Sequence, residues 1–598
     1  MLRLGPVFAL LIAIFAAALT LGADSPWSAL LFSTIVSALS AIVVAGARNS
    51  IGGLALGGLV GSVALFGIAI VNGWASVGAE EYAVLTAAFA MFASAQIAGR
   101  DNTSFERLWR ATILLGGLLA GAAFLDFIVD PTRFWGVSER PFHLERLSTP
   151  FFSANTAATF YGLIAISSLA EIARVLARHE PRSPRAVETL SKRLAIPVPA
   201  LLLSVTCVFL SGSRAGVTLL AVALLSLLIW EAAKRAKGSV DYRTVVVGVG
   251  AAALVLLGFA VSGELYAGRL ENLGLQGGGR AVMFDAYLNA IPYAPLFGHG
   301  LHGFQYINAL IADAENASLL MGQTAAHNVV LQWLLQGGLV GLSFVAAIAV
   351  GWLLLMRRGL NRRNRMKGYM RGAVVAAAFT VAHGMVDFAL EVPAFLFLFA
   401  WICGLAAGAA TGGSRPLVAF SGKAAVASKG AAVAVLVAAA GLSAWAYLDR
   451  ASGRSLASMS DEAFRARFDR ADAVSGSAYR REAIGRRAMR LDPPEPALAA
   501  AAFERALKLD GRDGRLEARY ALARIAATNT VPPDAAAAMT RSYLHTPYAP
   551  RTWLEWRLDI VESFWPLMPP QVREAAMREA RAFGRRARVE RFEAFSDQ

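Results

Sequence analysis

Four polar stretches in an otherwise apolar sequence carry side chains that could take part in chemistry. A polar side chain at membrane depth costs several kcal/mol unless it is satisfied, so we expect these stretches at the outward-facing rim of a membrane domain. They contain Arg214 in SGSRAG (211–216), Arg280, His299 and His302 in a glycine-rich segment (277–304), His327 with Asn328 in AAHNVVLQWLLQGGLVG (325–341), and His383 with Asp387 in TVAHGMVDFALEVPAF (380–395).

His327 is the best candidate for a general base, because a neutral imidazole at a solvated helix start can titrate near neutral pH. The other side chains also have structural explanations. Arg214 and Arg280 could equally well extend to lipid headgroups, and the glycines around His299 and His302 favour a turn with incidental imidazoles. His383 and Asp387 have the spacing of one helix face, which indicates packing more often than catalysis.

The elements that must position these residues are membrane-spanning helices. The chain has 598 residues, of which 56% are hydrophobic and only 17% charged, and its mean hydropathy is +0.50. Apolar runs of about 20 residues recur along it, as expected for spanning helices. We predict about 13 spans, near 5–23, 27–46, 51–73, 81–98, 109–129, 155–177, 195–211, 214–233, 243–262, 328–356, 372–391, 393–411 and 430–448.

Alternate loops between these runs are rich in Lys and Arg, which is typical of cytoplasmic loops. This pattern places the N-terminus inside and the segments 130–154, 211–216 and 263–327 outside, together with everything after residue 449. The net charge of +15 therefore reflects topology, and no nucleic-acid partner is expected. Residues 1–23 also fit a cleaved signal peptide, whose removal would leave the remaining topology unchanged.

We divide the chain into N-terminal transmembrane helices (1–100), transmembrane helices with the arginine turn (101–262), a large periplasmic loop (263–327), further transmembrane helices (328–449) and a tail (450–598). The fold class is all-α. The tail has apolar residues at helical spacing, and RAMRLDP (487–493) and RALKLDG (505–511) are weakly similar to tetratricopeptide repeats. Cys207 and Cys403 lie in apolar runs and indicate neither a disulfide framework nor a metal site.

The sequence HNVVLQWLLQGGLVG resembles the signature of the O-antigen ligase family, which also contains surface-polysaccharide polymerases and protein O-oligosaccharyltransferases. Its pattern is His-Asn, nine residues, Gly, two residues and Gly. LSGSRAG is similar to the family's outward arginine turn, GR followed by PLFGHGLHGF to its large external loop, and HGMVDF with EVPAF to the segment after the signature. RLSTPFFSANTAATF (146–160), with Asn155, is similar to an earlier external segment.

The resemblance implies a bacterial inner-membrane enzyme that moves a glycan from a polyprenyl diphosphate to an acceptor hydroxyl at the periplasmic face. Arg214 and Arg280 would bind the diphosphate, since the guanidinium fork suits phosphate oxygens. His327 would deprotonate the acceptor, and a single displacement would invert the anomeric centre. Supporting roles would fall to Asn328, Asn155, His299, His383 and Asp387.

No cofactor or metal is expected, because the membrane portion contains no Asp-x-Asp pair. The nearest approach, Asp313 with Glu315, fits a solvated loop face. The two glycines of the signature, with Gly337, indicate close helix packing or an approach to the lipid.

Several alternatives stay open at this stage. A ligase would use lipid A core as acceptor, and a polymerase would use another lipid-linked glycan; the long tail slightly favours the polymerase. The tail could instead dock polysaccharide-assembly proteins. A lipid-linked sugar transporter or flippase, or a membrane scaffold, is the alternative to an enzyme; the position of the polar residues at the rim favours surface chemistry.

Overall fold

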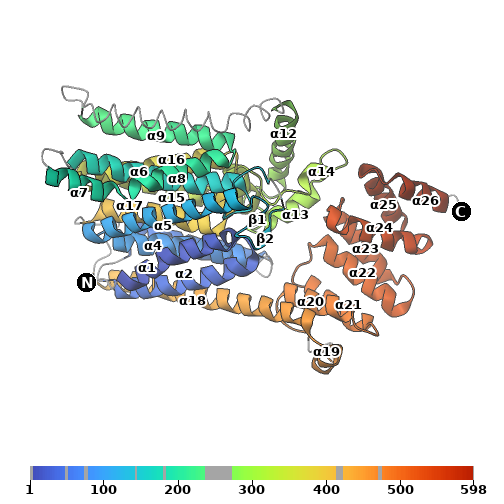
Figure 1. Ribbon diagram of the computed structural model, residues 1–598. Coiled ribbons are helices and arrows are strands. Elements are labelled where there is room, and N and C mark those ends of the chain that lie inside the picture. Colours follow the sequence, from blue (N-terminus) through green and yellow to red (C-terminus); the bar gives the residue numbers. More distant parts are fainter. Residues whose placement is uncertain are drawn as a thin grey trace.

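The computed structural model describes residues 4–47, 51–72, 78–141, 144–178, 184–235, 273–412, 422–468 and 474–596. Its membrane part is a bundle of helices, and a second group of helices formed by the tail lies beyond one end of that bundle (Figure 1). The membrane part contains α1 (Leu4–Leu19), α2 (Pro26–Gly46), α3 (Gly53–Val71), α4 (Ala79–Gly99), α5 (Asn102–Val129), α6 (Ala154–Arg178), α7 (Pro184–Leu194), α8 (Pro197–Leu210), α9 (Arg214–Arg235), α12 (Leu273–Ala290), α13 (Gly303–Leu310), α14 (Ala317–Leu320), α15 (Val329–Arg362), α16 (Lys367–Gly384), α17 (Pro393–Thr411) and α18 (Gly422–Ser455).

Ten helical stretches in the described residues are long and apolar enough to cross a membrane. Three of the predicted spans are not among them. The run at 5–23 forms the 16-residue helix α1, the run at 372–391 forms α16, which already ends at Gly384, and the run at 243–262 lies outside the described residues. A helical multi-pass bundle is therefore confirmed, and the count of about 13 stays a prediction.

Helices α4, α6 and α17 form the centre of the bundle, since most of their residues are buried. Helices α4 and α17 approach closely at small residues. A Cβ on Gly404 or Gly408 of α17 would collide with the backbone of α4 at Phe92 or Gln96. Glycine at these positions allows the two backbones to pack directly, as is common between membrane helices.

The two ends of the bundle differ in chemistry. One end carries a network of ion pairs in which Glu171 of α6 binds Arg110 of α5 and Arg174 of α6, and Glu106 binds Arg365. The other end carries the turn before α9, helices α12 to α14, and a two-stranded antiparallel hairpin of β1 (Arg133–Phe134) and β2 (Ser138–Glu139). Apart from this short hairpin, the described chain is helical, as the all-α prediction requires.

The tail follows α18 and lies beyond the end that carries α12 to α14 (Figure 1). Helix α18 has 34 residues and is therefore about 51 Å long at 1.5 Å per residue, well above the ~30 Å of a bilayer core. The tail contains the helices α19 (Asp461–Arg467), α20 (Ala478–Ala488), α21 (Pro496–Leu507), α22 (Gly514–Thr528), α23 (Pro533–His545), α24 (Arg551–Ser563), α25 (Pro570–Ala582) and α26 (Arg586–Ser596).

The tail has two apolar cores of its own, one around Phe464 and Phe503 and one around Trp565 and Leu558. Consecutive helices from α20 to α23 pack against one another. The predicted helical tail is thus present, and its assignment to tetratricopeptide repeats stays a prediction.

Candidate active site

The start of α15 holds His327 and Asn328 in a defined geometry. The Asn328 side chain caps the helix, since its Oδ1 accepts hydrogen bonds from the backbone N–H groups of Val330 (3.0 Å) and Leu331 (3.1 Å). Its Nδ2 donates to the carbonyl of Met385 at 3.2 Å, in the segment after α16. Asn328 therefore fixes the helix start and ties it to that segment.

His327 has one ring nitrogen available for proton transfer. Its Nε2 lies 3.0 Å from Oε1 of Gln323; because a carboxamide oxygen only accepts, Nε2 carries the proton and Nδ1 carries the lone pair. Nδ1 is buried and has no hydrogen-bond partner among the described residues. The ring packs edge-on against Phe388, with 4.9 Å between centroids.

Burial lowers the pKa of His327 from 6.5 to about 4, with a further contribution from the positive charge of Arg280. The sequence predicted titration near neutral pH, and the structure shifts it to lower pH because the ring is desolvated next to a cation. The imidazole is consequently neutral at pH 7, which is the form that can accept a proton.

Arg214 is the first residue of α9 and follows a tight turn at Ser211, Gly212 and Ser213. Gly212 has a φ of 58°, which glycine adopts without strain. The buried Arg146 attaches this turn to α6, because its Nε donates to the Ser211 carbonyl (2.6 Å) and its Nη2 to Oδ1 of Asn155 (2.9 Å). Arg146, which was not among the predicted site residues, thus connects Asn155 to the turn that precedes Arg214.

His383 and Asp387 do not share a helix face, so that prediction is wrong. Helix α16 ends at Gly384 and Asp387 lies in the following non-helical segment. His383 is buried and contacts α6 and the turn before α9 instead: its Nδ1 lies 2.6 Å from Oγ1 of Thr159 on α6, and its Nε2 lies 3.5 Å from Oγ of Ser213 in that turn. The alternative of packing between helices is therefore confirmed for His383.

Asp387 is also buried and is only partly satisfied. Its Oδ2 accepts a hydrogen bond from the backbone N–H of Ala389 at 3.1 Å, whereas Oδ1 has no partner among the described residues. The Asn155 side chain lies close to it. A buried carboxylate oxygen without a donor is costly, so this atom favours a binding function over a purely structural one.

Arg280 supplies positive charge to this region. It lies on α12, is exposed, and forms no hydrogen bond or ion pair with a residue that the structure describes. Its guanidinium is nevertheless close enough to act electrostatically on His327, His383 and Asp387. Five parts of the sequence therefore converge: the start of α6, the turn before α9, α12, the start of α15 and the end of α16.

His299 and His302 lie elsewhere. The His299 ring contacts Tyr306, with 6.2 Å between centroids, and its carbonyl accepts a hydrogen bond from Arg512 of the tail. His302 forms an ion pair with Glu81 of α4 at 2.7 Å, and this carboxylate raises the pKa of His302 to about 9. Among the described residues, His299 thus joins the loop to the tail and His302 joins the loop to α4, and no contact links His299 to His327.

Carboxylates that could bind a metal are used in other interactions. In the described part of the chain, Glu80, Glu81 and His302 have ligand atoms within 4.8 Å of one another, but Arg450 pairs with Glu80 and His302 with Glu81. Asp313 is exposed, and its Oδ1 accepts from the backbone N–H groups of Glu315 and Asn316, as expected for a loop turn.

The first glycine of the signature, Gly338, serves a contact that the sequence did not indicate. Gly338 has a φ of 60° and a ψ of −160° and breaks the regular geometry of α15. A loop, and not another helix, approaches at this break: Leu339 N donates to Pro295 O (2.9 Å) and Val340 N to Leu296 O (3.0 Å). Gly338 thereby joins the loop after α12 to the helix that begins next to His327.

Sequence reasoning missed four residues that hold the site together, namely Arg146, Thr159, Ser213 and Gln323. Arg146 and Thr159 both lie in the external segment around Asn155, and Gln323 stands four residues before His327. Their polarity next to the nominated residues was the available signal, but contacts over long sequence separations do not follow from spacing.

A comparison with known proteins covers part of the chain. Residues 199–346 match the family model described as O-Antigen ligase, a range that contains Arg214, Arg280 and His327. No curated protein matches the chain. Residues 199–346 of this multi-pass membrane chain are therefore similar to the O-antigen ligase family.

Proposed function

We propose that the chain transfers a glycan from a polyprenyl diphosphate to an acceptor hydroxyl at the outer face of the bacterial inner membrane. The observation that carries this proposal is the buried, unpartnered Nδ1 of neutral His327, next to the charge of Arg280. A base and a cation side by side suit a displacement in which a proton leaves one oxygen and negative charge develops on another.

In the proposed step, the acceptor oxygen forms a bond to the anomeric carbon while its proton passes to Nδ1 of His327. The bond between the anomeric carbon and the diphosphate oxygen breaks, and its electron pair leaves with the diphosphate. Arg280 and Arg214 bind the diphosphate and stabilise the charge. One displacement inverts the configuration, and neither a metal nor a cofactor is required.

Supporting roles follow from the contacts. Gln323 holds the His327 tautomer through Nε2, as a second group commonly does for a catalytic histidine. Asn328 fixes the helix start, and Asn155 is held by Arg146. Asp387 keeps one oxygen available to a sugar hydroxyl or to Arg280.

A complementation experiment tests the chemistry. In a strain that lacks the native gene, His327→Ala is expected to abolish surface-glycan assembly, whereas His383→Ala should retain a fraction of it. Arg214→Lys keeps the charge but loses the fork, so a large loss of transfer is expected. Full assembly with His327→Ala would refute the base assignment, and full activity of Arg214→Lys would favour an arginine that only extends to the lipid. Loss of activity with a chelator and recovery with Mg²⁺ would refute metal independence.

Glycan analysis of the deletion strain separates the acceptors. Single repeat units on lipid A would mean that a polymerase was lost, and accumulated long lipid-linked chains would mean that a ligase was lost. We favour the polymerase, with polysaccharide-assembly proteins as possible partners of the tail. Donor retained on the cytoplasmic side would instead favour a flippase.

Orientation can be tested with cysteines, since both native cysteines are buried. Ser318 lies at the end of the bundle with the candidate site and Ser191 on α7 at the opposite end, and both are exposed. A membrane-impermeant maleimide should label Ser318→Cys and not Ser191→Cys from the periplasm. The reverse pattern would refute the periplasmic placement.

A further inference from the structure

We infer that the C-terminal tail positions the transfer site, with Arg512 as the positioning residue. The inference rests on the proposed function. Arg512 lies in the connection between α21 and α22, and its Nη1 donates a hydrogen bond to the carbonyl of His299 at 3.2 Å. Its guanidinium also lies 4.8 Å from the ring centroid of Tyr306 on α13, a cation–π geometry.

The contact extends beyond one side chain. His545 at the end of α23 packs edge-on against the same Tyr306 ring, with 6.4 Å between centroids, and α23 lies against α13. The tail therefore holds Tyr306 and the His299 carbonyl from two of its own elements.

A second connection runs through the long helix α18. Arg450 near its end pairs with Glu80 at the start of α4, at 2.6 Å, and stacks over Tyr479 of α20. The neighbouring Glu81 pairs with His302 of the external loop. The start of α4 is consequently linked both to the tail and to the loop.

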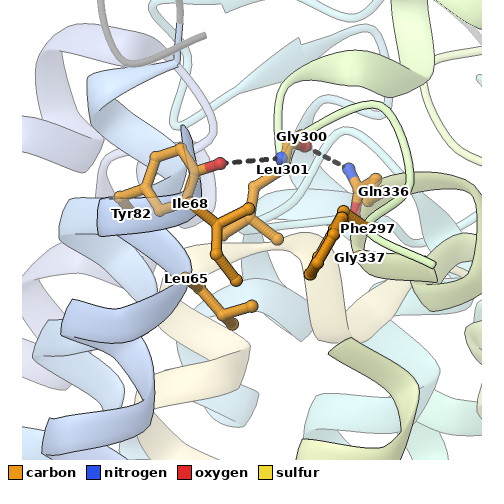
Figure 2. Close-up of a pocket in the computed structure, with 8 residues that line it drawn as sticks. All are labelled: Leu65, Ile68, Tyr82, Phe297, Gly300, Leu301, Gln336 and Gly337. Carbon is orange, nitrogen blue, oxygen red and sulfur yellow. Dashed lines mark hydrogen bonds between the residues drawn. The ribbon is translucent and has the colours of Figure 1, made fainter. Parts of the chain in front are cut away.

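The loop is clamped at Leu301, between these two connections. The Leu301 backbone N–H donates to the Tyr82 hydroxyl of α4 at 3.3 Å, and the Gln336 side chain of α15 donates to the Leu301 carbonyl (Figure 2). The cavity between these residues measures only about 10 Å³, the space of roughly one water-sized probe. The contact around Leu301 therefore leaves little space into which the loop could shift.

From this clamp the loop reaches the site through the backbone. His299 N donates to Leu335 O and Gly300 N to Gln336 O, each at 2.9 Å, just before the break at Gly338. The paired segment is the first part of α15, which begins next to His327, and the other end of the loop continues from α12, which carries Arg280. Arg512 thus contacts the one loop that joins the proposed base to a proposed diphosphate ligand.

Positioning predicts an effect that a merely structural tail contact would lack. Loss of the contact should let the loop move relative to α15, and small displacements of catalytic groups lower the rate of reaction far more than the binding of substrate. The transfer rate should therefore fall while the apparent affinity for the lipid-linked donor changes little.

The test compares Arg512→Ala with Arg541→Ala in the full-length protein. Arg541 pairs with Glu517 inside the tail, at 2.7 Å, and serves as the matched control. In Arg512→Ala we expect the maximal transfer rate to fall by roughly tenfold, the KM for the lipid-linked donor to change less than twofold, and the amides of His299 and Gly300 to exchange hydrogen faster. Arg512→Lys, which keeps a cation and one donor, should restore part of the rate.

The outcomes distinguish the inference from the proposed function. Wild-type transfer and wild-type amide protection in Arg512→Ala, with His327→Ala inactive, would overturn the positioning role and leave the proposed function intact. Equal losses in Arg512→Ala and Arg541→Ala would also overturn it, because they would indicate general destabilisation of the tail. Transfer by His327→Ala would instead contradict the proposed function itself.

Discussion

The glycine pair of the signature gives the sharpest prediction, because its two members have different structural environments. Gly338 has a φ of 60° and a ψ of −160°, a backbone region that is essentially restricted to glycine. A Cβ there would also lie 2.5 Å from the carbonyl carbon of Leu296 and 2.6 Å from the backbone nitrogen of Gly298. Gly341 is helical, and a Cβ there would meet Trp333 at an ordinary 3.4 Å.

The expected magnitudes follow from these environments. Gly338→Ala should cost about 1–3 kcal/mol for the strained backbone and a further ~1–3 kcal/mol for overpacking against a backbone that cannot retreat as a side chain could. Gly341→Ala should be neutral or stabilising by up to about 1 kcal/mol, since alanine favours helix. The loop is expected to leave α15 in the first variant and to stay in place in the second.

Thermal inactivation in detergent and amide hydrogen exchange measure the difference. In Gly338→Ala, the amides of Leu339 and Val340 should lose protection, because their acceptors are Pro295 and Leu296 of the loop, and transfer should fall sharply. The same inactivation temperature and the same exchange in both variants would mean that the loop contact does not depend on glycine at position 338.

Three further predictions concern charge. Burial and the Arg280 cation both lower the pKa of His327. Arg280→Gln should therefore raise that pKa and shift the acid limb of the normalised pH–rate profile to higher pH. An unshifted acid limb would contradict the assignment of His327 as the base. The carboxylate of Glu81 raises the pKa of His302 to about 9. The ion pair therefore contributes fully to holding the loop on α4 below about pH 6.5, and this contribution is lost as the pH rises through 9. Protease cleavage of the loop should increase in that range, and a cleavage rate that does not change with pH would contradict this prediction. In the tail, Arg557 and its partner Glu579 are fully buried, so Arg557→Ala should lower the free energy of unfolding of the tail by about 3–5 kcal/mol. Arg591→Ala, which breaks a solvent-exposed ion pair, should have a much smaller effect, and equal effects in thermal unfolding would disprove the distinction.

Local sequence properties were sufficient for the class of fold. Hydropathy identified most of the membrane helices. That Asn328 caps α15 is a finding of the structure, although capping depends only on residues within one helical turn. The limits of local reasoning appear at the end of α16. Spacing placed His383 and Asp387 on one face, but the helix stops between them at Gly384, and the chain turns toward Pro393 at the start of α17.

The candidate site shows the same difference between what local sequence predicts and what only the tertiary structure reveals. The residue types and the signature nominated His327, Arg214 and Arg280, whereas Arg146 was found only in the structure, where it binds Asn155 and the arginine turn across 65 residues of sequence. The transfer role of the nominated residues stays a proposal. His299 was predicted to be a supporting residue; its carbonyl contacts the tail and its N–H contacts α15, and the supporting role stays a prediction.

The sequence by itself determined that the chain is a helical membrane protein, that its polar residues gather in a few segments, and that these segments resemble one family. Those properties depend on the free energy of transferring short segments into lipid, to which each residue contributes separately. Only the tertiary structure decided that Gly338 admits a loop, that His327 has a desolvated lone pair beside Arg280, and that Arg512 of the tail reaches that loop. Such contacts join segments far apart in the chain, and they form only when the packed helices bring those segments together.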